Sequence, residues 1–234
     1  MRRKTLSRLV QRTFGDLLRK RRKGAGRKKS PDSGVSHLKR ELVTSRTPVL
    51  ITLKIRDLLP DLRTPEAYRV IRRALKEACM RPGGRETGGF RIVHFAILGN
   101  HLHLIVEATD NPSLSSGING LCRRMAEGLN RLWSRRGKVF ADRYHMRVLK
   151  TPRQVYNAIR YVYENARKHG LKTYEDRPDA YSSGLWFKGW KDYLHDGWLG
   201  WKNPVAEATS WLLREGWKMH GLLELRPAWD RTIV

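Results

Sequence analysis

Apolar and polar residues alternate along the middle of the chain in ways that predict a first strand and a first helix. Residues 49–55 are β-branched and apolar enough for a buried strand. Thr64 and Pro65 then form a helix start, and apolar residues recur near helical spacing until Pro82 stops the pattern. We therefore expect the ordered part of the chain to begin near Pro48.

The following segments predict a hairpin, a long helix, a fourth strand and a last helix. Two apolar runs at 90–98 and 101–108 are separated by a short polar turn, which favours antiparallel pairing. Residues 111–133 place apolar side chains along one helical stripe, and residues 144–149 predict the fourth strand. The last helix opens at Thr151 with a capping box completed by Gln154, and Gly170 lies past its end.

The order of these elements, βαββαβ, is that of a ferredoxin-like fold, in which two helices cover one face of an antiparallel sheet. We expect such an α+β domain over residues 48–170, continued by the last helix, which would carry catalytic residues. The 234-residue chain is long enough for one core of ordinary size plus extensions. Residues 1–47 and 171–234 are expected to be those extensions.

Positive charge is concentrated in the first extension. Residues 1–47 contain 16 Lys and Arg residues and three acidic residues, and such a segment repels itself and buries little apolar surface. It is predicted to be a disordered tail, either a DNA-binding arm or a merely solvated one. The whole chain has a formal net charge of +26, which indicates a polyanionic partner but would also suit nonspecific binding to RNA or anionic lipid.

The rest of the composition argues against secretion and against a cysteine metal site. Cys79 and Cys122 are the two cysteines and have no short spacing, and no apolar run approaches the roughly 20 residues that span a bilayer. We expect a cytoplasmic, nucleoid-associated protein without a membrane partner. Residues 171–234 are rich in Trp, which favours packing over the main domain more than base stacking, and they predict one short helix near 205–215.

His101 and His103 are the first candidates for chemistry. They lie two residues apart at the start of a predicted strand, where alternate side chains face the same way. Both imidazoles can therefore reach one metal ion. Taken alone, such a pair is better explained by two surface histidines, so the argument depends on a third group.

That third group is expected on the last helix. The apolar residues that form its buried stripe are Val155, Ile159, Val162 and Ala166. Tyr161 lies about 120° from the centre of that stripe, and Asn165 follows one turn later on the same side. A tyrosine there can attack a phosphodiester if a divalent ion, held by both histidines and the Asn165 carbonyl, polarises the phosphate. This mixed nitrogen and oxygen site suits Mn²⁺ and tolerates Mg²⁺.

Three stretches resemble the HUH single-strand DNA transposases, and among them the REP-associated tyrosine transposases. They are residues 97–105 (ILGNHLHLI), 140–145 (FADRYH) and 161–170 (YVYENARKHG), within a resemblance that covers about 48–170. It implies that His101 and His103 bind the metal, that Tyr161 attacks DNA and that Asn165 completes the metal site. The chain departs from the family at Tyr163, where relatives often have His, and at Ala166, where they often have Pro.

The resemblance further implies a DNA substrate and a covalent intermediate. Single-stranded DNA would be cut and rejoined at hairpin or palindromic repeats, with the 5′ phosphate linked to Tyr161 and a 3′ hydroxyl released. The enzyme would act as a monomer or as a homodimer. The cations expected to contact the DNA backbone, each equally well explained as solvated surface, are Arg123, Arg124, Arg131, Arg143, Arg147, Arg160, Arg167 and Lys168.

Two other interpretations stay open at this point. One is a domesticated, non-catalytic nucleic-acid-binding protein of the same fold. The other is a metal-dependent hydrolase whose third ligand is Glu107, because that residue shares strand parity with the histidines. Tyr163 is the next candidate if Tyr161 is not the nucleophile. The sequence leaves open the target repeat and whether the protein mobilises an element.

Overall fold

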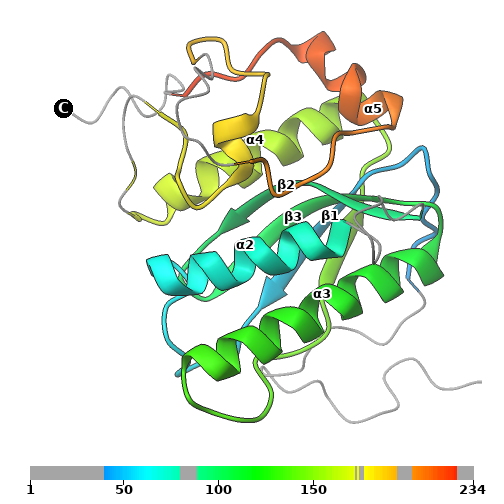
Figure 1. Cartoon of the computed structure of the whole chain (residues 1–234). Coiled ribbons are helices and arrows are strands. Elements are labelled where there is room, and N and C mark those ends of the chain that lie inside the picture. Colours follow the sequence, from blue (N-terminus) through cyan, green and yellow to red (C-terminus); the bar gives the residue numbers. More distant parts are fainter. Residues whose placement is uncertain (1–39, 80–88, 172, 174–176, 194–201, 226–234) are drawn as a thin grey trace, which may run out of the picture. The chain divides into compact units, whose positions relative to one another are not determined.

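The computed structural model describes residues 40–79, 89–171, 173, 177–193 and 202–225, all of which fall within one compact unit. The regular elements follow the βαββαβ order and then continue into a further helix (Figure 1). They are β1 (Val49–Lys54), α2 (Pro65–Cys79), β2 (Phe90–Ile97), β3 (His101–Ala108), α3 (Asn111–Leu132), β4 (His145–Val148) and α4 (Pro152–Lys168). The α+β, ferredoxin-like fold class predicted from the pattern is confirmed.

The four strands form one antiparallel sheet in the order β2-β3-β1-β4. β2 and β3 are the predicted hairpin, and a bulge in β2 falls between Ile92 and His94. In the centre of the sheet, Thr52 of β1 lies opposite His103 of β3 on one side and opposite His145 of β4 on the other. Paired residues in neighbouring strands face the same side of a sheet, so these three side chains form one row across it.

Helices α2 and α3 cover one face of the sheet (Figure 1). Their apolar stripes, which include Ile71 and Leu121, are fully buried against strand residues such as Ile51 and Leu104. The helices approach the sheet closely, since a Cβ atom at Gly117 of α3 would lie 2.3 Å from the Phe90 ring. No helix in the described ranges is long and apolar enough to span a membrane.

The opposite face carries α4, which packs on β2 and β3, and the described part of the Trp-rich extension packs on α4 in turn. The predicted stripe of α4 is buried. It forms a second core with residues of the extension, which include Phe187, Trp190, Leu213 and Trp217. Trp211 is 58% exposed, and Trp198 and Trp201 lie outside the described residues. α4 is therefore held between the sheet and the extension.

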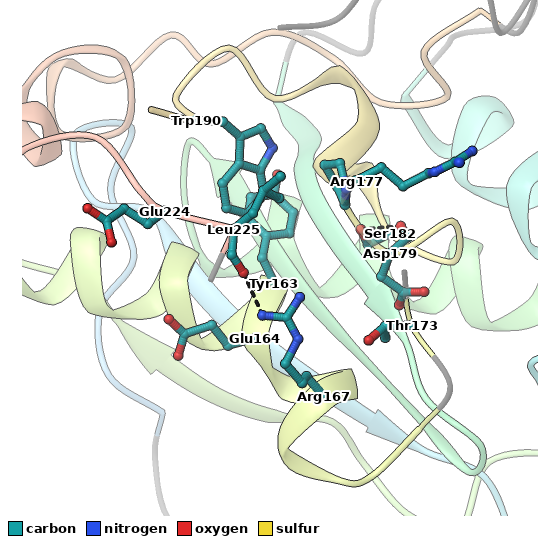
Figure 2. Close-up of a pocket in the computed structure, with 11 residues that line it drawn as sticks. Tyr163, Glu164, Arg167, Thr173, Arg177, Asp179, Ser182, Trp190, Glu224 and Leu225 are labelled. Carbon is teal, nitrogen blue, oxygen red and sulfur yellow. Dashed lines mark hydrogen bonds between the residues drawn. The ribbon is translucent and has the colours of Figure 1, made fainter. Parts of the chain in front are cut away.

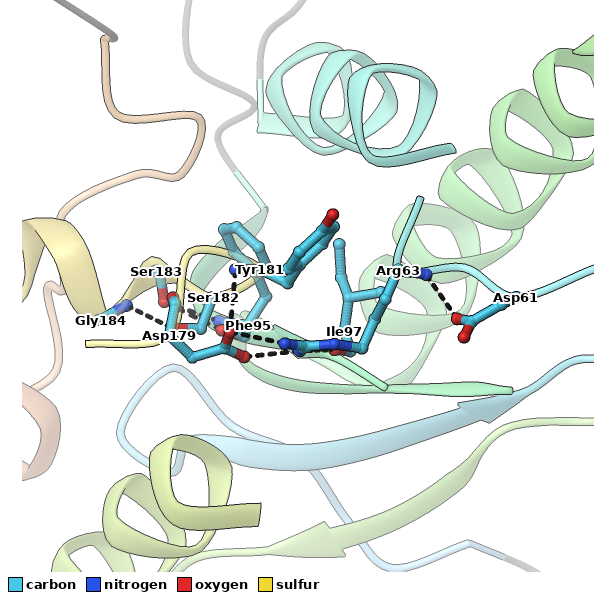
Figure 3. Close-up of polar contacts among 9 residues, drawn as sticks. All are labelled: Asp61, Arg63, Phe95, Ile97, Asp179, Tyr181, Ser182, Ser183 and Gly184. Atoms are coloured by element: carbon cyan, nitrogen blue, oxygen red, sulfur yellow. Dashed lines mark hydrogen bonds and ion pairs between the residues drawn. The ribbon is translucent and has the colours of Figure 1, made fainter. Parts of the chain in front are cut away.

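The extension also covers the free edge of β2 (Figure 3). The backbone nitrogen of Ile97 donates to the carbonyl of Tyr181 at 2.9 Å, and that of Phe95 donates to Oγ of Ser183 at 2.8 Å. Next to this contact, the two terminal nitrogens of the buried Arg63 guanidinium donate to the Asp179 carboxylate at 2.7 and 2.8 Å. This segment therefore satisfies backbone groups that an open edge strand would expose.

The ordered part of the chain begins earlier than the pattern indicated. The charge pattern predicts that residues 40–47 belong to the disordered tail, yet Val43 is only 1% exposed. The Asn111 side chain holds this segment, since its Oδ1 accepts from the nitrogen of Val43 at 2.8 Å and its Nδ2 donates to the carbonyl of Glu41 at 2.9 Å. Residues 1–39, the rest of the predicted tail, lie outside the described residues.

The helix expected near 205–215 is shorter and begins later. It is α5 (Trp211–Arg214), followed by the 3₁₀ turn η2 (Gly216–His220), and a further 3₁₀ turn, η1 (Ser183–Trp186), precedes them. The residues just before α5 are not helical, because they form hydrogen bonds with the sheet. Ala206 donates its backbone nitrogen to the carbonyl of Ile92 at 2.9 Å, which the sequence of the segment alone does not reveal.

Candidate active site

His101 and His103 share the α4 side of the sheet, as their strand parity predicts. Their ring centroids are 4.8 Å apart and the ring planes are inclined at 82°. His103 is only 3% exposed, whereas His101, at the beginning of β3, is half-buried. The pair is thus fixed by the strand and reaches solvent through His101.

Each of the two imidazoles has an oxygen beside its Nδ1 atom. Oγ1 of Thr52 lies 3.0 Å from Nδ1 of His103, and Oδ1 of Asn100 lies 2.7 Å from Nδ1 of His101. An acceptor at Nδ1 favours the tautomer that leaves the Nε2 lone pair for a metal, and metal-binding histidines are commonly held in this way. Thr52 and Asn100 are neighbours of the candidate site that the sequence pattern does not single out, because one is a strand residue and the other a turn residue.

The surroundings keep both histidines neutral. Burial lowers the pKa of His103 to about 3, with smaller contributions from the neighbouring His101 and His169. Burial also lowers the pKa of His101, again with His169 contributing, together with Lys54. Neutral imidazole is the form that binds metals. His169 caps the end of α4, and its ring centroid lies 5.8 Å from that of His101, so it is a further neighbour of the site that sequence reasoning did not single out.

Tyr161 extends from α4 to the histidine pair. Its hydroxyl oxygen lies 3.3 Å from Nε2 of His103, the ring centroids are 4.9 Å apart, and the side chain is 39% exposed. The helix that carries it is fixed at its start, where Oγ1 of Thr151 accepts from the nitrogen of Gln154 at 3.3 Å. A predicted nucleophile and a predicted metal ligand therefore meet in one chain.

Tyr163, two residues further along α4, points to a different place. It is 8% exposed, and its hydroxyl lies 2.7 Å from Nδ1 of His94 and 3.2 Å from Oγ of Ser183. Burial raises its pKa. The structure therefore places Tyr163 in the second core, which speaks against it as the alternative nucleophile.

Asn165 lies one helical turn beyond Tyr161 and is 3% exposed, and its Nδ2 atom is buried without a hydrogen-bond partner. Such orphaned buried amides are rare, and an ion or ligand is one of the usual reasons for them. Because an amide can turn over, Asn165 can offer its carbonyl oxygen. Among the described residues, no group of three His, Cys, Asp or Glu side chains could hold a metal, so a site at the histidine pair needs a ligand of another type. A donor set of two imidazoles and one amide oxygen would suit Mn²⁺ and tolerate Mg²⁺, and Asn165 is the residue that we expect to complete it.

Glu107 is occupied elsewhere. Its carboxylate accepts hydrogen bonds from the backbone nitrogen and the hydroxyl of Thr209 at 2.9 and 2.7 Å, and from the backbone nitrogen of Ser210 at 2.8 Å. The side chain is 4% exposed, and Arg91 lies 3.9 Å away. Its contacts therefore make Glu107 an anchor for the extension, and the hydrolase interpretation loses its third metal ligand.

The eight cations expected to contact DNA do not form one surface. Arg123, Arg124 and Arg131 belong to α3, on the opposite face of the sheet from the histidine pair. Arg160 and Lys168 both bind the Glu164 carboxylate at 2.9 Å. Arg167 donates to the carbonyl of Leu225, and Arg143 precedes β4. Arg147 of β4 shares the histidine side of the sheet, because its register partner Leu50 is also that of Ile105.

A pocket elsewhere on α4 takes no part in this arrangement. It lies between the C-terminal half of α4 and the extension, and its lining includes Tyr163, Arg167 and Trp190 (Figure 2). Tyr161 and the histidine pair are not among its lining residues. The candidate active site is therefore an exposed position at the side of α4 and not this pocket.

Among solved structures, the chain is similar to a REP-associated tyrosine transposase that was solved bound to a REP hairpin. The likeness covers 75% of this chain and 94% of that chain, with a TM-score of 0.52 and 19% sequence identity. This likeness shows that the two chains share a fold. No protein-family model and no curated protein matches the sequence. The roles of individual residues therefore depend on the geometry of the site itself.

Proposed function

We propose that the chain is a metal-dependent DNA strand transferase that cuts single-stranded DNA with Tyr161 and rejoins it through a 5′-phosphotyrosine link. The observation that carries this proposal is the 3.3 Å contact between the Tyr161 hydroxyl and Nε2 of His103, an imidazole whose other nitrogen lies beside Thr52. A tyrosine next to a metal ligand is suited to phosphoryl transfer. The similar transposase fold, solved with hairpin DNA, supports hairpin or palindromic repeats as the substrate.

The proposed reaction exchanges one phosphoester for another. The Tyr161 oxygen loses its proton and attacks phosphorus, the new bond between oxygen and phosphorus forms, and the bond to the 3′ oxygen breaks. That oxygen leaves with a proton as a 3′ hydroxyl, and a second 3′ hydroxyl later reverses the step. A divalent ion held by His101, His103 and Asn165 would polarise the phosphate and offset its charge. The buried stripe of α4 fixes the attacking oxygen, which reduces the entropic cost of the step.

The decisive experiment compares Tyr161→Phe with Tyr156→Phe, a tyrosine of the same helix that lies against His220. Both variants and the unchanged protein are incubated with Mn²⁺ and labelled hairpins that have single-stranded flanks, and the products are resolved on denaturing gels. We expect a covalent adduct with the unchanged protein and with Tyr156→Phe, and none with Tyr161→Phe. Since Tyr161→Phe removes one part-exposed hydrogen bond, stability should fall by no more than about 1 kcal/mol.

The other interpretations give different products in the same assay. A metal-dependent hydrolase would cleave the hairpin without forming an adduct, and a non-catalytic binding protein would shift the hairpin on a native gel without cleaving it. An adduct formed by Tyr161→Phe would show that the proposed nucleophile is wrong.

A further inference from the structure

The α4 side of the sheet is only partly covered. α4 packs on β2 and β3, and the second core of α4 and the extension is likewise built on residues of these strands, such as Ala96 and Ile105. The half formed by β1 and β4 keeps exposed side chains on this side, namely Lys54, His145 and Arg147. This open half begins directly beside the histidine pair, because Lys54 lies opposite His101 and Thr52 lies opposite His103.

The side chains on this open half are donors of hydrogen bonds and carriers of positive charge. We call this set of side chains the β4 platform. It consists of Thr52 and Lys54 of β1 together with His145 and Arg147 of β4. The residues of β1 and β4 that point to this side include no carboxylate, and Lys54 pairs with the exposed Asp57 of the following loop at 3.2 Å. Within the described part of the chain, neither the His145 nor the Arg147 side chain has a hydrogen-bond or ion-pair partner. Two donors on β4 thus have no binding partner among the described residues.

We propose that the β4 platform holds the phosphate backbone of the single strand whose scissile phosphate Tyr161 attacks. The proposal rests on the proposed function, because it starts from a phosphate bound at the histidine pair. From there, the row of His103, Thr52 and His145 leads across the sheet, and two strand spacings make its length roughly 10 Å. His145 and Arg147 then follow each other along β4, about 6.8 Å apart.

The chemistry of the platform favours a single strand contacted through its phosphates. The platform has no Phe, Tyr or Trp side chain for base stacking, and its donors suit negatively charged oxygens. A DNA strand that crosses the sheet from β3 to β4 would pass next to the side of α4 that carries Tyr161. His145 and Arg147 therefore position the strand next to the nucleophile and take no part in bond breaking.

The first test measures binding in the Tyr161→Phe protein, so that no cleavage interferes. His145→Gln combined with Arg147→Gln is compared with Lys76→Gln, an exposed substitution on α2 across the sheet. Fluorescence anisotropy with Mn²⁺ gives the Kd of a hairpin with single-stranded flanks and of the same hairpin without them. We expect the double substitution to weaken binding of the flanked hairpin about tenfold and to lower its salt dependence by roughly 0.7 per lost phosphate contact. The bare hairpin, and Lys76→Gln with either probe, should change less than twofold.

The second test identifies the phosphate that Arg147 contacts. Each flank phosphate near the cleavage site is replaced in turn by a neutral methylphosphonate. At one position the replacement should weaken binding to the Tyr161→Phe protein but cause no further loss when Arg147→Gln is also present, because both changes remove the same contact. Additive losses at every position would overturn the proposal, as would an equal loss for flanked and bare hairpins.

Adduct formation by the protein without substitutions separates this proposal from the proposed function. If the adduct forms but the double substitution leaves the flanked hairpin unaffected, the platform is wrong and the strand transferase stands. If no adduct forms but the flanked hairpin alone is weakened, the platform binds single strands and the proposed chemistry is wrong.

Discussion

Thr52 of β1 contacts His103 of the neighbouring strand β3 through a single hydroxyl group. Its Oγ1 atom lies 3.0 Å from Nδ1 of His103, and no other hydrogen bond of that imidazole apart from the one with Tyr161 is seen in the described residues. As an acceptor, this oxygen would hold the proton of His103 on Nδ1 and leave Nε2 for a metal ion. Thr52, which also belongs to the β4 platform, thus lies beside the nitrogen of His103 that faces away from Tyr161.

We predict that Thr52→Val weakens metal binding about 10- to 100-fold, because it keeps the shape of the side chain but removes the oxygen beside His103. The measurement is the Mn²⁺ concentration that gives half-maximal adduct formation. Thr52→Ser, which retains the hydroxyl, is the matched control and should stay close to the unchanged protein. An equal Mn²⁺ requirement for the valine and serine variants would show that this contact does not orient His103.

The local sequence pattern was enough to select the histidine pair and Tyr161 as candidates. It did not identify the residues that contact and orient them, such as Thr52. Strand parity gave the shared face of His101 and His103, and helical spacing gave the off-stripe position of Tyr161. Thr52 reaches His103 only through the pairing of two strands that are far apart in the sequence. Such a partnership depends on sheet register, which a single sequence does not specify.

At the scale of elements, α4 and the extension depend on each other. The strands and the helices α2, α3 and α4 were predictable because their periods and caps are local signals. The described part of the extension was not, since the conformation of its short turns is set by contacts with β2, β3 and α4. Glu107 is the clearest case, because its place on β3 suggested a metal ligand whereas the extension occupies its carboxylate.

We predict that Glu107→Gln lowers the free energy of unfolding by about 1 to 3 kcal/mol, because one amide oxygen must replace a carboxylate that accepts from Thr209 and Ser210. Urea denaturation measures this change. Glu77→Gln, at the surface of α2, should change stability by no more than about 0.5 kcal/mol. The Mn²⁺ requirement for adduct formation should not change, and a large rise in that requirement without loss of stability would restore Glu107 as a metal ligand.

At the scale of the whole molecule, the position of α4 bears on how many chains make one active site. Tyr161 contacts His103 of its own chain at 3.3 Å, and α4 is packed on both sides, by the sheet and by the extension. Exchange of α4 between two chains would have to detach both of these apolar surfaces before they pack on the partner. The sequence left monomer and homodimer open, and we predict an active site that is complete within one chain.

Mixing two inactive variants tests this arrangement. Tyr161→Phe and His103→Ala proteins are combined in equal amounts, incubated with flanked hairpin and Mn²⁺, and assayed for adduct. We expect none, because neither chain can supply a tyrosine and a histidine pair together. Adduct formation by the mixture would show that the tyrosine helix of one chain serves the histidines of another. Each variant mixed with the unchanged protein controls for inhibition.

The packing of the extension on α4 also has a consequence for the order of events during synthesis. Domains begin to fold from the N-terminal side while the ribosome is still adding residues, and the sheet with α2 and α3 can assemble at that stage. The outer side of α4 is fully covered only when residues 205–225 have emerged, because Leu213 and Trp217 complete the cover that Phe187 and Trp190 begin. A growing chain therefore carries its histidine pair on a formed sheet before the second core around α4 is complete. The packing that holds the helix of Tyr161 is thus the last part of the described fold to be finished.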